Sequence, residues 1–147
     1  MVDYTDISPS QLSRIKPLWM LNKEFHEAIE PVFCDQYASL VFEDRMDAIA
    51  SGCDTMRITI TEENASIIGY CISTVKGALG EVASLHVHVS QRGRGIGKHL
   101  LALHVDWLKR NGCSEIGLYV SPNNGVAIEL YKSQKLYPNI LYMQLKE

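Results

Sequence analysis

Three glycines within five residues, Gly93, Gly95 and Gly97, follow an apolar run that ends at Val89 and precede an amphipathic stretch that begins near Lys98. This order predicts a strand, a glycine-rich turn and the N-terminus of a helix. Amides in the first turn of a helix have no intrahelical acceptor, and they carry the positive end of the helix dipole. Glycine lets the backbone approach a ligand because it has no Cβ. The stretch therefore predicts an anion site, and phosphate is the usual anion at such a site.

The spacing of these glycines argues against two common nucleotide sites. A dinucleotide fold requires G-x-G-x-x-G, whereas this chain has G-x-G-x-G. A nucleotide P-loop requires G-x-x-x-x-G-K-[ST]. Here Gly97-Lys98 is followed by His99, and the residue five positions before Gly97 is Arg92. Neither class of nucleotide site fits.

Composition narrows the class of protein further. Fourteen basic and seventeen acidic residues leave a formal charge of −3, which disfavours nucleic acid as a partner. No apolar run approaches the ~20 residues of a membrane span, and the N-terminus lacks the pattern of a signal peptide. Four separated cysteines without a CxxC pair indicate reduced residues, with neither a disulfide framework nor a metal site. We expect one cytoplasmic domain over residues 1–147, without a membrane partner.

The elements that position the glycine turn follow from periodicity and turn residues. Residues from Ser8 onward predict a helix that Pro17 kinks or splits. Further helices are expected over Asp35–Ala50, Gly97–Arg110 and Val126–Gln134. Strands are expected over the following ranges: Val2–Tyr4, Met56–Thr61, Ile67–Val75, Glu81–Val89, Glu115–Val120 and Ile140–Leu145. The strand–helix–strand order around the turn predicts one parallel, right-handed βαβ unit after an antiparallel meander. The fold class is therefore α/β with a mixed (α+β) sheet.

Two motifs resemble the signatures of the GNAT superfamily of acyl-CoA N-acyltransferases. The run Arg92-Gly93-Arg94-Gly95-Ile96-Gly97 satisfies the family pattern [Q/R]-x-x-G-x-[G/A]. Further along, Asn124-x-x-Ala127-x-x-Leu130-Tyr131 matches the second signature, at a spacing that also fits. The resemblance is specific over residues 80–131, and elsewhere only the order of elements agrees. It implies a GNAT-like fold, with a central, mostly antiparallel twisted sheet, one parallel βαβ unit and flanking helices.

The resemblance implies acetyl-CoA as the acyl donor, bound without a metal. The pyrophosphate is expected on the amides of the turn, with positive charge from the basic side chains beside it. In the family, the strand before the turn splays from its parallel neighbour and offers amides to the pantetheine arm, which here would be those of Val87 and Val89. The expected cofactor-binding residues are Val87, Val89, Arg92, Gly93, Arg94, Gly95, Ile96, Gly97, Lys98 and Asn124.

The resemblance also implies catalytic roles. Tyr131 matches the family's tyrosine near the CoA sulfur, where it would protonate the leaving thiolate, and a phenol with pKa ≈ 10 can donate at neutral pH. Glu81 is the first candidate for the base, followed by His86, His88 and water. Ala83 stands where relatives often carry an acid, a departure that weakens the case for a carboxylate base. Strict alternation would place Glu81 and Ala83 on one strand face and the two histidines on the other.

The implied function is an N-acetyltransferase in which a primary amine attacks acetyl-CoA directly in a ternary complex. The alternative is a non-catalytic acyl-CoA-binding sensor or regulatory module. The acceptor is open between a small-molecule amine and the amine of a protein or peptide, and Glu27 and Glu30 are candidates for selecting a cationic one. Acyl-chain length and the choice between monomer and homodimer are open as well.

Overall fold

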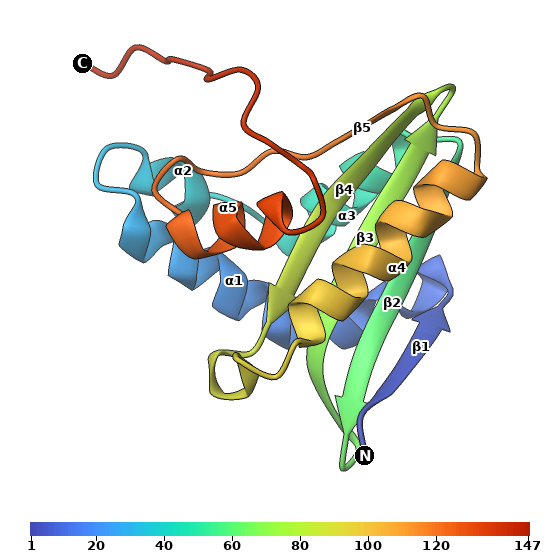
Figure 1. Cartoon of the computed structure of the whole chain (residues 1–147). Coiled ribbons are helices and arrows are strands. Elements are labelled where there is room, and N and C mark those ends of the chain that lie inside the picture. Colours follow the sequence, from blue (N-terminus) through green and yellow to red (C-terminus); the bar gives the residue numbers. More distant parts are fainter.

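The computed structural model describes residues 1–147 as a mixed five-stranded sheet with helices on both faces (Figure 1). The strands lie side by side in chain order: β1 (Asp3–Ile7), β2 (Thr55–Glu63), β3 (Ser66–Lys76), β4 (Leu79–Val87) and β5 (Glu115–Gly117). The first four strands pair antiparallel, and β4 pairs with β5 in parallel. The expected mixed sheet with one parallel βαβ unit is confirmed.

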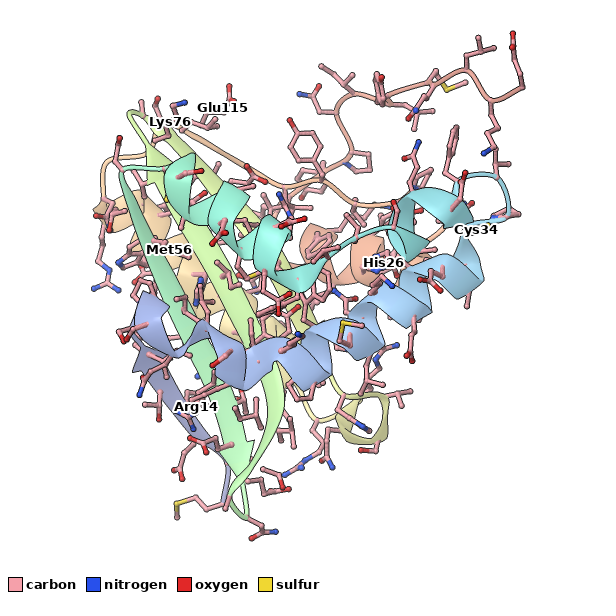
Figure 2. All side chains as sticks on the ribbon, turned by 180° about the vertical axis from the view of Figure 1, so that it is seen from behind. Arg14, His26, Cys34, Met56, Lys76 and Glu115 are labelled. Carbon is pink, nitrogen blue, oxygen red and sulfur yellow. The ribbon has the colours of Figure 1, made fainter.

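Helices cover the two faces unequally. One face carries the 3-10 helix η1 (Pro9–Ile15) together with α1 (Lys16–Ile29) and α3 (Phe42–Ser51), which lie nearest the viewer in Figure 2. The other face carries α4 (Ile96–Arg110), the crossover helix between β4 and β5. The short helices α2 (Cys34–Ala38) and α5 (Gly125–Lys132) complete the fold. None of the helices is both long and apolar enough to cross a membrane.

The central strand β3 separates two hydrophobic clusters. Tyr70 and Ile72 point into the first, which is built with α1 and α3, whereas Ile68 and Cys71 point into the second, under α4. Successive strand residues point to opposite faces, so a strand covered on both sides must be apolar at every position. This double burial explains why Ile67–Val75 is a nearly continuous apolar run.

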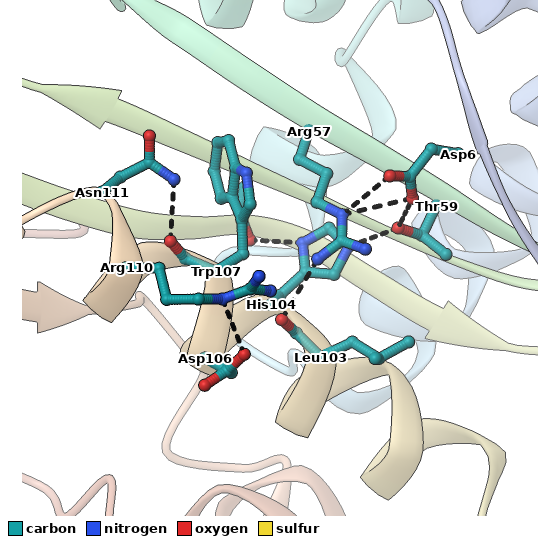
Figure 3. A network of polar contacts seen from close by, with 10 residues as sticks. Asp6, Arg57, Thr59, Leu103, His104, Asp106, Trp107, Arg110 and Asn111 are labelled. Atoms are coloured by element: carbon teal, nitrogen blue, oxygen red, sulfur yellow. Dashed lines mark hydrogen bonds and ion pairs between the residues drawn. The ribbon is translucent and has the colours of Figure 1, made fainter.

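A chain of hydrogen bonds between polar side chains connects α4 to the sheet (Figure 3). Thr59 donates its hydroxyl hydrogen to Asp6 Oδ1 at 2.6 Å, and His104 Nε2 lies 2.8 Å from the same threonine oxygen. Since that oxygen has already used its hydrogen, His104 Nε2–H must donate to it. His104 Nδ1 then accepts from the Ser73 hydroxyl at 2.7 Å. Burial lowers the pKa of His104 to about 3, so the imidazole is neutral at pH 7 and both ring nitrogens are hydrogen-bonded.

Two of the helical segments in the sequence pattern are interrupted in the structure, one at a proline and one where side-chain burial restarts the helix. Pro17 splits the first helical pattern, as expected, and stands at the start of α1. The single helix predicted over Asp35–Ala50 is wrong, because the chain is extended at Val41 between α2 and α3. Restarting the helix at Phe42 turns Phe42, Met46 and Ile49 to the core, and the Phe42 ring packs edge-on to Trp19 at 5.3 Å between centroids.

The C-terminal part of the chain differs most from the sequence expectation. The strand predicted over Glu115–Val120 pairs with β4 only as far as Gly117. The strand predicted over Ile140–Leu145 does not form, and its apolar side chains stay exposed: Ile140 is 88% and Leu145 81% accessible. Lys146 ties the end of this segment to Asp35 of α2 at 2.9 Å. The short β5 leaves no extended ladder on which a further strand could pair.

Candidate functional site

A backbone gap opens between β4 and the chain that follows β5. Pairing of the two parallel strands ends at Glu81 and Gly117. The His88 amide donates to Ile68 of β3 at 2.8 Å. Amides alternate in direction along an antiparallel strand, so those of Leu85 and Val87 point away from β3 into the gap. The Val87 amide thus has no partner strand on the β5 side, and its contact with the pantetheine arm stays a prediction.

The glycine-rich turn closes one end of this gap. Gly93 and Gly95 have φ values of +84° and +78°, in the left-handed region that favours glycine, and Gly95 caps α4. The helix begins at Ile96, so the amides of its first turn have no intrahelical acceptor. Consecutive amides around left-handed residues form an anion-binding concavity. The backbone of the turn thus has the conformation of an anion-binding loop.

The three basic side chains of the turn are used differently. Arg94 makes a two-pronged ion pair with Glu63 at 2.9 and 2.8 Å, and it also donates to Gln91 at 2.6 Å. Arg92 places its guanidinium 5.2 Å from the centroid of the Phe25 ring on α1. Lys98 is exposed and makes no ion pair, and Arg92 is likewise exposed and unpaired, so both of these cations can meet a ligand.

Val89 lies outside the strand that it was expected to end. The 3-10 helix η2 (Val89–Gln91) begins there, and His88 caps it by accepting from the Ser90 amide at 3.1 Å. Val89 is 71% exposed. The strand thus stops at Val87, two residues earlier than predicted, because the chain must turn to bring the glycines over the end of the gap.

Tyr131 lies on α5 and packs against the second hydrophobic cluster, which includes β4 residues. Asn124 caps this helix, since its Oδ1 accepts from the Ala127 amide at 3.2 Å. The Tyr131 ring packs against the second hydrophobic cluster, and burial raises the pKa of its hydroxyl to about 12, with a smaller contribution from Cys71. The phenol is therefore protonated at neutral pH and is a proton donor there.

Leu130 of α5 packs beside Gly97 in the first turn of α4. A Cβ added at Gly97 would lie 3.4 Å from Leu130 Cδ2 and 3.6 Å from Val87 Cγ2, which are ordinary contact distances. The first turn of α4, strand β4 and α5 therefore pack together at Gly97. This packing brings the two sequence motifs, 27 residues apart between Gly97 and Asn124, to the same gap.

A β-bulge at Ala83 corrects the alternation predicted for β4. Ile72 pairs with Ser84 but Ser73 pairs with Val82, so Ala83 has no partner. Ala83 packs against the first cluster, and Ser84 also faces that side, where its hydroxyl lies 2.8 Å from the Tyr70 hydroxyl. Two successive side chains thus share one face.

Because of the bulge, the candidate bases Glu81 and His86 lie on the same face of β4, the face that α1 and α3 cover. Glu81 and Ala83 line a cavity of about 120 Å³ together with Arg45 of α3. His86 lies further along on the same face and is buried. Burial lowers the pKa of His86 to about 4, assisted by Arg92, His26 and His88. His86 is therefore neutral at pH 7 and can accept a proton.

The sequence did not reveal the partners of Glu30, which ends α1. Its carboxylate is only 7% exposed and accepts hydrogen bonds from the Ser121 hydroxyl and, at 3.3 Å, from the Asn123 amide. These partners lie 91 and 93 residues away, in the loop between β5 and α5. No local pattern signals such a contact.

Known proteins resemble this chain in sequence and in fold. The model of the acetyltransferase (GNAT) family matches residues 18–135. A mycothiol acetyltransferase from Renibacterium salmoninarum is 39% identical over 56 residues, which cover 38% of this chain and 17% of that relative's length. An aminoglycoside acetyltransferase from an uncultured soil metagenomic sample has the same fold, with a TM-score of 0.71 at 15% identity over 99% of this chain and 96% of the other. An aminoglycoside N-acetyltransferase in complex with CoA follows, with a TM-score of 0.68 at 16% identity over 99% and 98%.

Proposed function

The chain belongs to the acetyltransferase (GNAT) family, and we propose that it transfers the acetyl group of acetyl-CoA to a primary amine, with residues 1–147 forming the acetyltransferase domain. The observation that supports the proposal is the part of β4 beyond Glu81, which is unpaired on the β5 side, leads into a glycine-rich turn with left-handed glycines and packs in the same cluster as the protonated Tyr131. A long ligand with a diphosphate at one end and a thioester at the other fits this order of features.

The cradle holds the diphosphate in this proposal. Amides around Gly93, Gly95 and the first turn of α4 donate to its oxygens, and Lys98 adds charge. The free amide of Val87 pairs with the pantetheine arm, and Asn124 contacts the same arm with the amide nitrogen that its cap leaves available. Arg94 acts through its ion pair with Glu63, which holds the turn against the β2–β3 hairpin.

Acetyl-CoA, when bound, supplies the activated thioester, and the protein supplies proton transfer and an oxyanion contact. Glu81 takes the proton that the amine must lose, on the face of β4 that the bulge at Ala83 opens toward α3. An inward amide of β4 stabilises the negative charge that develops on the carbonyl oxygen. Tyr131 gives its proton to the leaving thiolate, since its phenol is protonated throughout the neutral range.

The acceptor in this proposal is a small-molecule amine. The aminoglycoside acetyltransferases and the mycothiol acetyltransferase named above, with which this chain shares fold or sequence, have small-molecule substrates in their names. An acceptor would approach from the side of α1 and α2, where Phe25, His26 and Tyr37 form a partly buried aromatic wall with the rings of His26 and Tyr37 stacked at 5.2 Å.

The test is thiol release from acetyl-CoA with a panel of amines that includes aminoglycosides, amino sugars and polyamines. We expect release that depends on one class of amine and that yields an N-acetylated product by mass spectrometry. Saturable binding of acetyl-CoA without release for any amine would instead assign the chain to the sensor class, for which Ala83, in place of an acid, is the favouring observation.

A further inference from the structure

Glu30 is a buried carboxylate in an unfavourable place. It follows the last residue of α1, where the helix dipole is negative, and it is only 7% exposed. Burial of an ionised carboxylate is costly unless hydrogen bonds or charges compensate. None of the ion pairs of the protein involves Glu30, so its two oxygens rely on the Ser121 hydroxyl and the Asn123 side-chain amide. The two hydrogen bonds that compensate the burial of Glu30 therefore hold Ser121 and Asn123 in place.

Those partners belong to the loop that leads into α5. Ser121 Oγ also accepts from the Asn123 backbone amide at 3.1 Å, and the Ser121 carbonyl accepts from the Asn124 amide at 3.0 Å. The loop is therefore a closed turn held at one point by Glu30. Asn124 then caps α5 through the Ala127 amide, so the turn and the helix move as one unit.

Helix α5 has few other constraints. It contains eight residues, none of which is fully buried. An isolated helix of that length is not stable in water, so its position depends on what holds its ends. Its N-terminal end is held by the turn at Ser121, and its inward face by Leu130 against Gly97. Tyr131 is carried by this helix.

We propose that Glu30 is a positioning residue that holds α5, and with it Tyr131, at the depth required for proton donation. The proposal rests on the proposed acetyl transfer. It adds that the wall of the acceptor side, α1, and the helix that carries the acid are joined through one carboxylate. Glu30 itself touches no reacting atom.

Three variants test this link, and they are expected to affect folding stability to different extents. Glu30→Ala removes both hydrogen bonds, and Asn123→Ala removes one of them from an exposed residue. Glu30→Gln keeps the size of the side chain and can still accept from Ser121, and it bonds Asn123 once that amide flips. Glu24→Ala is the control, because Glu24 is an exposed carboxylate of the same helix without a hydrogen bond.

Hydrogen exchange of residues 125–133, measured by mass spectrometry, gives a readout that does not need enzyme activity. We expect exchange at least ~10-fold faster in Glu30→Ala and a smaller increase in Asn123→Ala, because the free energy of local opening of α5 falls when its turn is released. Glu30→Gln and Glu24→Ala should exchange at the wild-type rate. Unchanged exchange in Glu30→Ala would overturn the proposal whether or not the protein turns over any amine.

Kinetics with an amine that the wild type acetylates test the link to Tyr131. We expect Glu30→Ala to lower kcat several-fold with little change in the KM for acetyl-CoA or the amine, Glu30→Gln to restore kcat, and Glu30→Ala to have no further effect on kcat in a Tyr131→Phe background. Additive losses, or a rise only in the KM of the amine, would show that Glu30 does not act through Tyr131. Absence of turnover in the wild type would instead count against the proposed function, and the exchange data would still decide the role of Glu30.

Discussion

Arg94 and Glu63 form a two-pronged ion pair, at 2.9 and 2.8 Å, that joins the glycine-rich turn to the hairpin between β2 and β3. The contact lowers the pKa of the Glu63 carboxyl and raises that of the Arg94 guanidinium, mainly through the hydrogen bonds themselves. The charge of Arg94, a basic residue of the glycine-rich motif, is therefore paired within the protein. Its contribution to ligand binding is to hold the turn in place.

Loss of either partner should therefore weaken binding of acetyl-CoA to the same modest extent. We expect Arg94→Gln and Glu63→Gln each to raise the Kd of acetyl-CoA no more than about fivefold, since partly exposed pairs contribute up to ~1 kcal/mol. The double variant should be no worse than either single one. Calorimetric titration of the four proteins measures this, and a much larger effect of Arg94→Gln alone would mean that Arg94 binds phosphate directly.

A side chain at Gly95 should damage ligand binding more than folding. Gly95→Ala places a Cβ in the left-handed region, at a cost of about 1 kcal/mol, and puts it beside the amides of the cradle. Gly112→Ala is a matched control, because Gly112 has the same φ of +78° and equally open surroundings at the far end of α4. We expect similar losses of Tm in both variants, with the Kd of acetyl-CoA raised on the order of tenfold only in Gly95→Ala. Equal Kd values in the two variants would place the diphosphate elsewhere.

Removal of the Tyr131 hydroxyl should slow turnover without affecting donor binding. General acids contribute at least ~100-fold, so we expect Tyr131→Phe to lower kcat by about that factor while the Kd of acetyl-CoA stays the same. Tyr137→Phe is the control, because that ring is 68% exposed. Since the pKa of Tyr131 is about 12, its deprotonation should not limit the wild-type rate below pH 10. A kcat unchanged by Tyr131→Phe across pH would remove Tyr131 from the acid role.

The candidate bases can be separated by pH profiles. We expect Glu81→Gln to lower kcat/KM about tenfold or more, with only a small effect of His86→Gln. If His86 is the base, its pKa of about 4 should set an acidic limb near pH 4 that His86→Gln abolishes. Profiles that neither substitution changes would leave proton removal to water.

The buried His104 should make folding stability depend on pH. Burial, followed by the charge of Arg57, lowers its pKa from 6.5 to about 3, with Asp6 opposing the shift. The unfolded chain therefore binds a proton at His104 that the folded protein does not, and stability is lost as the pH falls from 6.5 towards 3. We expect a contribution of about 2 kcal/mol to be lost at pH 5 relative to pH 8.

Urea unfolding at the two pH values, with His104→Gln as the comparison, measures that contribution. The variant loses stability at pH 8 because hydrogen bonds with Ser73 and Thr59 change, but its pH dependence between 5 and 8 should be weaker than that of the wild type. An identical pH dependence would assign the effect to another group, of which the buried His86 is the first to examine.

The conformation of the glycine-rich turn followed from local sequence. Gly93 and Gly95 stand where the backbone is left-handed, and a glycine pattern next to a helix start indicates that conformation directly. The Asn124 cap is likewise a local feature, because it joins residues three positions apart. The sheet order was also predictable, since consecutive strands with short connections become neighbours.

Only the tertiary structure decided which residues meet across the gap. The bulge at Ala83 comes from the pairing of β3 with β4, and it moved Glu81 and Ala83 to the face that the simple alternation assigned to His86. Glu30 meets Ser121, which lies 91 residues away, through tertiary packing, and Ile140–Leu145 forms no strand. Such contacts depend on the summed geometry of packed elements, which no short stretch of sequence encodes.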